Sequence, residues 1–174
     1  MWRDWIGCAR TPVSYLTVME KRENVQDYPR PPALEAVSSV LRVVFAGREI
    51  ALTSAGVRVL ETHHAPTYYV PVSDIDASAL VPAGGGSFCE WKGRAAYFDV
   101  TAGGACAPRA AWSYPNPSDR FHAIADYVAF YPALMDECFV GQEQVRPQPG
   151  GFYGGWVTSY LDGIVKGAPG TNHW

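Results

Sequence analysis

Residues 41–52 read LRVVFAGREIAL, and this stretch decides the class of fold. Leu41, Val43 and Phe45 occupy every second position, which is the period of a strand with one buried face. Gly47 permits a tight turn, and a second apolar run follows it. The stretch therefore predicts a β-hairpin.

Apolar runs continue along the chain between glycines and prolines. We expect further short strands at residues 57–61, 67–70, 88–91, 95–100 and 110–114. Pro66 and Pro71 bracket the second of these and favour an edge position, because proline cannot donate to a ladder. Gly84, Gly85 and Gly86 predict a loop.

One short helix is expected among the strands. Ser118 offers an N-cap, Phe121, Ile124 and Val128 recur at helical spacing, and Pro132 should end the helix. The glycine-rich tail predicts extended segments and turns. Short strands with a lone helix indicate a mainly β (β-rich α+β) fold, either a single antiparallel curved sheet or an open barrel.

The first 38 residues differ in character from the rest. Residues 28–32 read YPRPP, and prolines at this density fix an extended connector. We therefore expect an N-terminal extended arm over residues 1–38 and a β-rich domain over residues 39–174. Trp2 and Trp5 suggest that the arm docks on the domain or on a second copy, which would give a homo-oligomer.

Composition argues against several classes of function. The net charge is −3, and the 14 basic residues form no run longer than two, so nucleic-acid binding is not expected. Charges within the first five residues interrupt any signal peptide, and no apolar stretch reaches the roughly 18 residues of a membrane helix. We expect a cytoplasmic protein with no membrane contact. The four cysteines form no C-x-x-C pair and no H-x-x-x-H pattern occurs, so neither a metal nor a cofactor is expected.

Six short motifs follow one another along the chain: VLET at 59–62, PTYYVP at 66–71, CEWKGR at 89–94, AWSYP at 111–115, AFYP at 129–132 and GGFYGGWVT at 150–158. In order and spacing they resemble the domain-of-unknown-function family 427, from about residue 40 to the C-terminus. The resemblance implies a small β-rich domain with a tent-like sheet and no established activity. The family is also labelled nucleotidyltransferase-like domain 9, but this sequence has neither a phosphate loop nor a carboxylate–metal motif. Some tent-shaped proteins hold zinc through paired C-x-x-C motifs, which are absent here.

Charged residues within these motifs are the candidates for chemistry. Glu61 continues the face of Val57 and Val59, so its carboxylate should lie at the end of an apolar row, with Lys92 or Lys166 as partner. Both a structural ion pair and a functional role remain open for it. Between residues 87 and 92, a strand would place Cys89 and Trp91 on one face and Glu90 and Lys92 on the other. Cys89 is expected to pack as a small hydrophobe. His63 and His64 should point apart, and one of them could serve as a general acid or base.

Three hypotheses follow, and none assigns a catalytic residue or a reaction. The preferred one is a binding domain for a small polar or anionic metabolite in an aromatic-lined pocket. The candidate pocket residues are Glu61, Tyr68, Cys89, Trp91, Lys92, Trp112, Tyr114, Trp156 and Lys166. The second is a small-metabolite enzyme with Glu61 as acid/base and Lys92 as anion clamp. The third is a protein-interaction domain assembled through the N-terminal arm.

Overall fold

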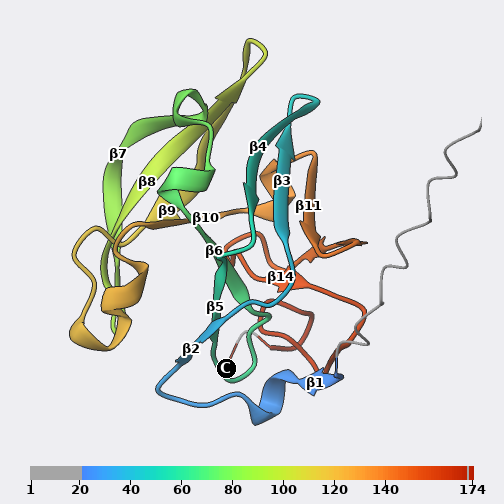
Figure 1. The fold of residues 1–174 in the computed structure, drawn as a ribbon. Helices are drawn as coiled ribbons and strands as arrows, with labels where there is room; N and C mark the ends of the chain where they lie inside the picture. Colours follow the sequence, from blue (N-terminus) through green and yellow to red (C-terminus); the bar gives the residue numbers. More distant parts are fainter. Residues whose placement is uncertain (1–20, 172) are drawn as a thin grey trace, which may run out of the picture.

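The computed structural model describes residues 21–171 and 173–174, and nearly half of these lie in strands, most of them paired antiparallel (Figure 1). The larger sheet has seven strands in the order β2 (Ala33–Ala36), β5 (Val57–Leu60), β6 (Thr67–Pro71), β10 (Tyr127–Phe130), β9 (Ala105–Ser113), β8 (Gly93–Ala102) and β7 (Leu80–Cys89). The smaller has four in the order β12 (Glu143–Gln144), β11 (Glu137–Val140), β3 (Leu41–Phe45) and β4 (Arg48–Thr53). The expected mainly β fold is confirmed, and the sheets of the described part form no closed barrel.

Short elements complete the fold. Two pairs of two-residue strands join β1 (Glu23–Asn24) to β15 (Leu161–Asp162) and β13 (Arg146–Pro147) to β14 (Trp156–Val157). The 3₁₀ segments are Val25–Asp27, Val72–Asp74, Ala77–Ala79, Asp119–Ile124 and Pro132–Leu134. No helix in the described ranges has the length and apolar character needed to cross a membrane.

The seven-stranded sheet buries different residues on its two faces. On one face Tyr68 and Val70 of β6 join a core with Leu41 and Val43 of the four-stranded sheet. On the other face Tyr69, one residue away from Tyr68, joins a second cluster of buried residues. This second cluster consists of Val59, Tyr69, Ala95, Trp112, Tyr114, Phe121, Ile124 and Ala129. The period of two along each strand therefore gives the sheet a core on one side and a second apolar layer on the other.

The hairpin at residues 41–52 forms as expected, from β3 and β4. Phe45 pairs with Arg48, so Ala46 and Gly47 are the two turn residues. Both have positive φ, 50° and 69°, as the turn type that matches the twist of a tight hairpin requires.

Two expectations about strands are wrong. β6 is not an edge strand but lies between β5 and β10. Pro66 precedes β6 and Pro71 ends it, so neither interrupts the ladder within the strand. The three glycines expected as a loop instead lie within β7, where the pairing with β8 shifts register between Ala83 and Gly86. Gly85 has a φ of 84°, so these glycines form a bulge rather than a break.

The expected helix is present but short. It spans Asp119–Ile124, and Phe121 within it departs from helical geometry. The helical spacing extends to Val128, yet that residue lies in β10, paired with Val70 of β6 and Ser113 of β9. Pairing with two distant strands thus overrides the local pattern.

The second half of the expected arm forms two strands that pair with strands of the β-rich domain. β2 pairs with β5 at the edge of the seven-stranded sheet, and β1 pairs with β15. The prolines at 29, 31 and 32 occupy only the connection between these strands. Trp2 and Trp5, together with Cys8, lie outside the described residues.

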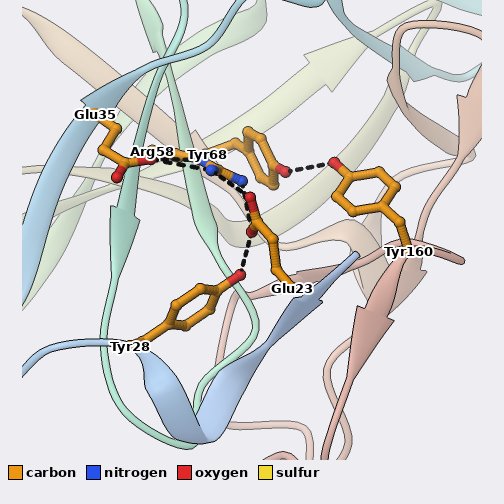
Figure 2. Close-up of polar contacts among 6 residues, drawn as sticks. All are labelled: Glu23, Tyr28, Glu35, Arg58, Tyr68 and Tyr160. Carbon is orange, nitrogen blue, oxygen red and sulfur yellow. Dashed lines mark hydrogen bonds and ion pairs between the residues drawn. The ribbon is translucent and has the colours of Figure 1, made fainter. Parts of the chain in front are cut away.

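A polar network fixes this N-terminal segment to the sheet (Figure 2). Arg58 donates two hydrogen bonds to the carboxylate of Glu23, at 3.0 and 2.7 Å, and another to Glu35 at 3.0 Å. Tyr28 donates to the same Glu23 carboxylate at 2.5 Å. Burial alone would raise the pKa of Glu23, but its hydrogen bonds from Arg58 and Tyr28 outweigh burial and lower that pKa. The network is structural and lies on the face of β5 opposite Val59.

Candidate functional site

A pocket of about 340 Å³ lies on the second face of the seven-stranded sheet. Its walls include Val59 of β5, Tyr69 of β6, Tyr97 of β8 and Trp112 of β9. These are the alternate positions that point away from the main core. The volume falls at the lower end of the roughly 300–1,000 Å³ that is typical of small-molecule sites.

Seven of the nine candidate residues line this pocket. They are Glu61, Cys89, Trp91, Lys92, Trp112, Tyr114 and Lys166. They come from β7 and β9, from the positions directly after β5 and β9, from the β7–β8 turn and from the C-terminal segment, so distant parts of the chain meet at one pocket.

Tyr68 and Trp156 are not brought to the pocket. Both are buried in the main core, with ring centroids 5.2 Å apart. The Trp156 indole donates to the carbonyl of Phe130 at 3.1 Å, and the Tyr68 hydroxyl lies 3.3 Å from that of Tyr160 (Figure 2). Alternation along β6 sends Tyr69 to the pocket in place of Tyr68.

The turn after β7 brings together side chains that were expected on opposite faces. The strand ends at Cys89, and the chain turns back into β8 at Gly93, whose φ is 98°. Ser118 holds this turn by donating its hydroxyl to the carbonyl of Trp91 at 2.6 Å and its amide to that of Lys92 at 3.2 Å. Cys89 and Lys92 both line the pocket as a result.

Lys92 is the charged group that the pocket buries most. Its exposed fraction is 9%, and its Nζ lies 5.7 Å from the ring centroids of both Tyr114 and Phe121. Within the described ranges no carboxylate pairs with Lys92 or Lys166, and Glu61 pairs with neither lysine. Aromatic faces attract an ammonium group but do not neutralise its charge.

Two donors in the lining have no partner. The Tyr69 hydroxyl and the Trp91 indole N–H are buried without a hydrogen bond from the described protein atoms. Burial also raises the pKa of Tyr69, which keeps that hydroxyl protonated. Unpaired buried donors are costly, so each of these two groups needs an acceptor from water or from a bound molecule.

His64 lines the pocket as a neutral donor. Burial lowers its pKa to about 4, and the charges of Lys166, Lys92 and Arg30 act in the same direction. The Gln148 amide oxygen accepts from the Ala65 N–H at 3.1 Å, so its nitrogen is the atom that lies 3.3 Å from His64 Nδ1. Nδ1 must then accept, which places the proton of the neutral ring on Nε2.

His63 points elsewhere, as expected of adjacent histidines, although the cause is a turn and not a strand. Its ring packs against Trp174, with centroids 4.5 Å apart, and its φ of 65° belongs to the turn.

The mouth of the pocket combines an ion pair with exposed rings. Arg30 and Glu90 pair at 3.1 Å, and both side chains are more than half exposed. Phe88 and Phe152 also line the pocket, and each is 75% exposed.

Sequence reasoning missed several lining residues. They are Arg30, His64, Tyr69, Phe88, Tyr97, Tyr131, Gln148, Phe152 and Tyr153. Alternation could have identified Tyr69. Thr67 and Tyr69 pair with Val59 and Val57 of β5, so they lie on the sheet face that also bears Glu61. No local signal identifies Gln148, which reaches the pocket from an irregular segment.

No group of three or more metal-ligating side chains gathers within residues 21–171 and 173–174.

A family model described as "Domain of unknown function (DUF427)" matches residues 33–141. Five of the six motifs lie inside this range, and the sixth supplies Phe152, Tyr153 and Gly154 to the pocket. No curated protein matches the chain.

Proposed function

Because the chain belongs to the DUF427 family, whose function is unknown, we propose from the geometry of the pocket that the domain binds a small anionic metabolite. The observation that carries this proposal is Lys92, a residue that is only 9% exposed in the pocket wall and has no carboxylate partner in the described part. A buried charge normally requires a partner, and a bound anion would supply it.

The surroundings of Lys92 support the same conclusion. Lys166 lines the same pocket, and the charges of both lysines act on His64. Tyr69 and Trp91 add unpartnered donors. A pocket with aromatic walls and a few convergent polar groups is the usual form of a small-molecule site.

Thermal unfolding with simple anions tests the proposal. Benzoate, acetate and inorganic phosphate would each be added at about 10 mM. A ligand with a dissociation constant of about 1 mM should then stabilise the protein by about 1.4 kcal/mol, a Tm rise of about 3–6 °C. We expect at least one anion to give this shift in the wild type, and the shift to be lost in Lys92→Met.

Lys21→Met is the matched control, because Lys21 is exposed and lies outside the pocket. It should respond as the wild type does. The proposal fails if no anion raises the Tm of the wild type, or if the anions raise the Tm of Lys92→Met as much as that of the wild type.

A second candidate function uses the same pocket for catalysis. Glu61 lines it without an ion pair to either lysine, which leaves its carboxylate available as an acid or base in the pocket that also holds Lys92 as anion clamp. Incubation with pooled metabolites would show turnover that disappears in Glu61→Gln. Turnover that persists in this variant would contradict the role of Glu61.

Assembly through the N-terminal arm stays a prediction. Since residues 23–36 contribute β1 and β2, the deletion that tests it is limited to residues 1–20. A smaller oligomer after this deletion, measured by light scattering, would support the role of the arm, and an unchanged mass would contradict it.

A further inference from the structure

We propose that the ligand is a planar, ring-bearing monoanion of the aryl carboxylate class, and not a phosphate ester or nucleotide. This inference rests on the proposed anion-binding function and narrows it to one chemical class.

The first argument is the charge of the lining. Three cationic side chains and two carboxylates line the pocket, which leaves one net positive charge. Arg30 and Glu90 neutralise each other at the mouth, and His64 is uncharged. The charges that remain in the pocket are therefore the two positive charges of Lys92 and Lys166 and the one negative charge of Glu61. One negative charge balances this set, whereas a dianion would place an uncompensated charge near the Glu61 carboxylate.

The second argument is the supply of donors. Tyr69 and Trp91 each present an unpartnered, buried N–H or O–H group, and Lys92 presents an ammonium group. A ligand that satisfies them needs several acceptor lone pairs in a compact group. A carboxylate offers two oxygens with about four acceptor positions, which is sufficient for these three donors.

The third argument is the shape of the walls. Trp112 and Tyr131 pack with ring centroids 4.4 Å apart, and Tyr97 and Tyr114 line the same cavity. Flat side chains on several sides favour a flat ligand, because offset stacking and edge contacts add to the burial of apolar area.

The fourth argument is the exposed rim. Phe88 and Phe152 are the two most exposed large hydrophobic side chains of the described residues, and both line this pocket. Apolar side chains that are exposed around the rim of a pocket are typical of ligand-binding sites. The apolar ring of a ligand whose carboxylate lies inside against Lys92 would reach these residues and cover them.

Matched probes separate the features of the ligand. Isothermal titration calorimetry at pH 7.5 would compare 2-naphthoate with 2-naphthamide, which lacks the charge, and with cyclohexanecarboxylate, which lacks the flat ring. A fourth probe, 2-naphthyl phosphate, carries nearly two negative charges at this pH, since its second pKa lies near 6. We expect 2-naphthoate to bind at least about tenfold more tightly than each of the other three.

Two variants test the charge and rim arguments separately. Glu61→Gln removes the repulsion against a dianion, so the affinity for 2-naphthyl phosphate should rise by about tenfold while that for 2-naphthoate changes less. Phe152→Ser should weaken 2-naphthoate by about three- to tenfold and leave cyclohexanecarboxylate nearly unchanged. Lys21→Met serves again as the control and should match the wild type for every probe.

The outcomes distinguish this inference from the function on which it rests. If 2-naphthyl phosphate binds more tightly than 2-naphthoate and both need Lys92, the anion site stands and the monoanion assignment is overturned. If cyclohexanecarboxylate equals 2-naphthoate, the planar assignment is overturned. If none of the four probes binds the wild type, or if Lys92→Met binds them unchanged, both the inference and the proposed function fall.

Discussion

His64 makes the stability of this protein depend on pH in a way that its structure determines. Its imidazole lies in the pocket wall, and Gln148 holds Nδ1 as an acceptor. Burial lowers the pKa of His64 to about 4, assisted by the positive charges of Lys166, Lys92 and Arg30. The His63 ring contributes in the same direction. Replacing His64 with glutamine removes this titration while keeping a polar side chain.

The sign of the effect follows from the two pKa values. In the unfolded chain His64 has an ordinary pKa of about 6.5, so below that pH the unfolded state takes up a proton that the folded state refuses. Stability therefore falls as pH drops from about 6.5 to about 4, by at most about 1.4 kcal/mol per pH unit. Above about pH 7 the group has almost no effect. Over the two units to pH 4.5 the limit is about 2.7 kcal/mol, and partial contact of the ring with solvent reduces it to about 2 kcal/mol.

Urea unfolding followed by circular dichroism measures this directly. The free energy of unfolding would be determined for the wild type and His64→Gln at pH 7.5, 6.0, 5.0 and 4.5. Carboxylates such as Glu23 also lose stabilising interactions in acid, but they do so in both proteins and cancel in the difference. The quantity to compare is the free energy of unfolding of the wild type minus that of His64→Gln. We expect this difference to be constant above pH 7 and to be about 2 kcal/mol lower at pH 4.5.

His122→Gln is the control, because His122 is exposed on the Asp119–Ile124 segment. It should retain the pH dependence of the wild type. A wild-type-minus-His64→Gln difference that stays flat from pH 7.5 to 4.5 would refute a buried, neutral His64 and the proton assignment that rests on it.

Three other substitutions test separate parts of the structure by chemical denaturation. Arg58→Met leaves half-buried carboxylates unpaired and should cost about 2–4 kcal/mol, whereas Arg22→Met, which breaks an exposed pair, should cost less than about 1 kcal/mol. Lys92→Met should be neutral or stabilising by about 1 kcal/mol, since it removes a buried charge without a partner; a loss above about 2 kcal/mol would indicate a structural role instead. Gly155→Ala should cost about 1–3 kcal/mol, because its Cβ would lie 2.7 Å from the Ala65 carbonyl oxygen, while Gly84→Ala meets nothing within 4 Å and should be nearly neutral.

Where local signals were complete, the sequence predicted the fold well. The hairpin of β3 and β4 needs only alternation and a glycine turn, and both are contained within twelve residues. Prediction failed where the partner strand lies far away. Val128 fits the helical spacing that starts at Phe121, but residues 127–130 form a strand that pairs with β6 and β9 in the middle of the larger sheet. A short apolar segment takes the conformation that its neighbours impose, and those neighbours are not encoded nearby.

The candidate site shows the same division. Alternation put Glu61 on the face of Val59, and both residues line the pocket, because Glu61 directly follows a regular strand. It would also have separated Tyr68 from Tyr69 if it had been applied to β6, since adjacent residues cannot share a face. Trp156 follows glycines that carry no period, and its core position depends on the distant Phe130 carbonyl.

Lys92 explains why the charged part of the site needed the structure. Regular strand geometry would have carried its side chain away from Cys89, to the opposite face of β7. The strand instead ends three residues earlier, and Gly93 reverses the chain with a φ that other residues rarely adopt. The turn is held from outside by Ser118, which lies 26 and 27 residues after the two residues it bonds. The reversal therefore places the Lys92 side chain near the rings of Tyr114 and Phe121, without an ion pair to any carboxylate of the described residues, and the proposed anion site rests on this arrangement.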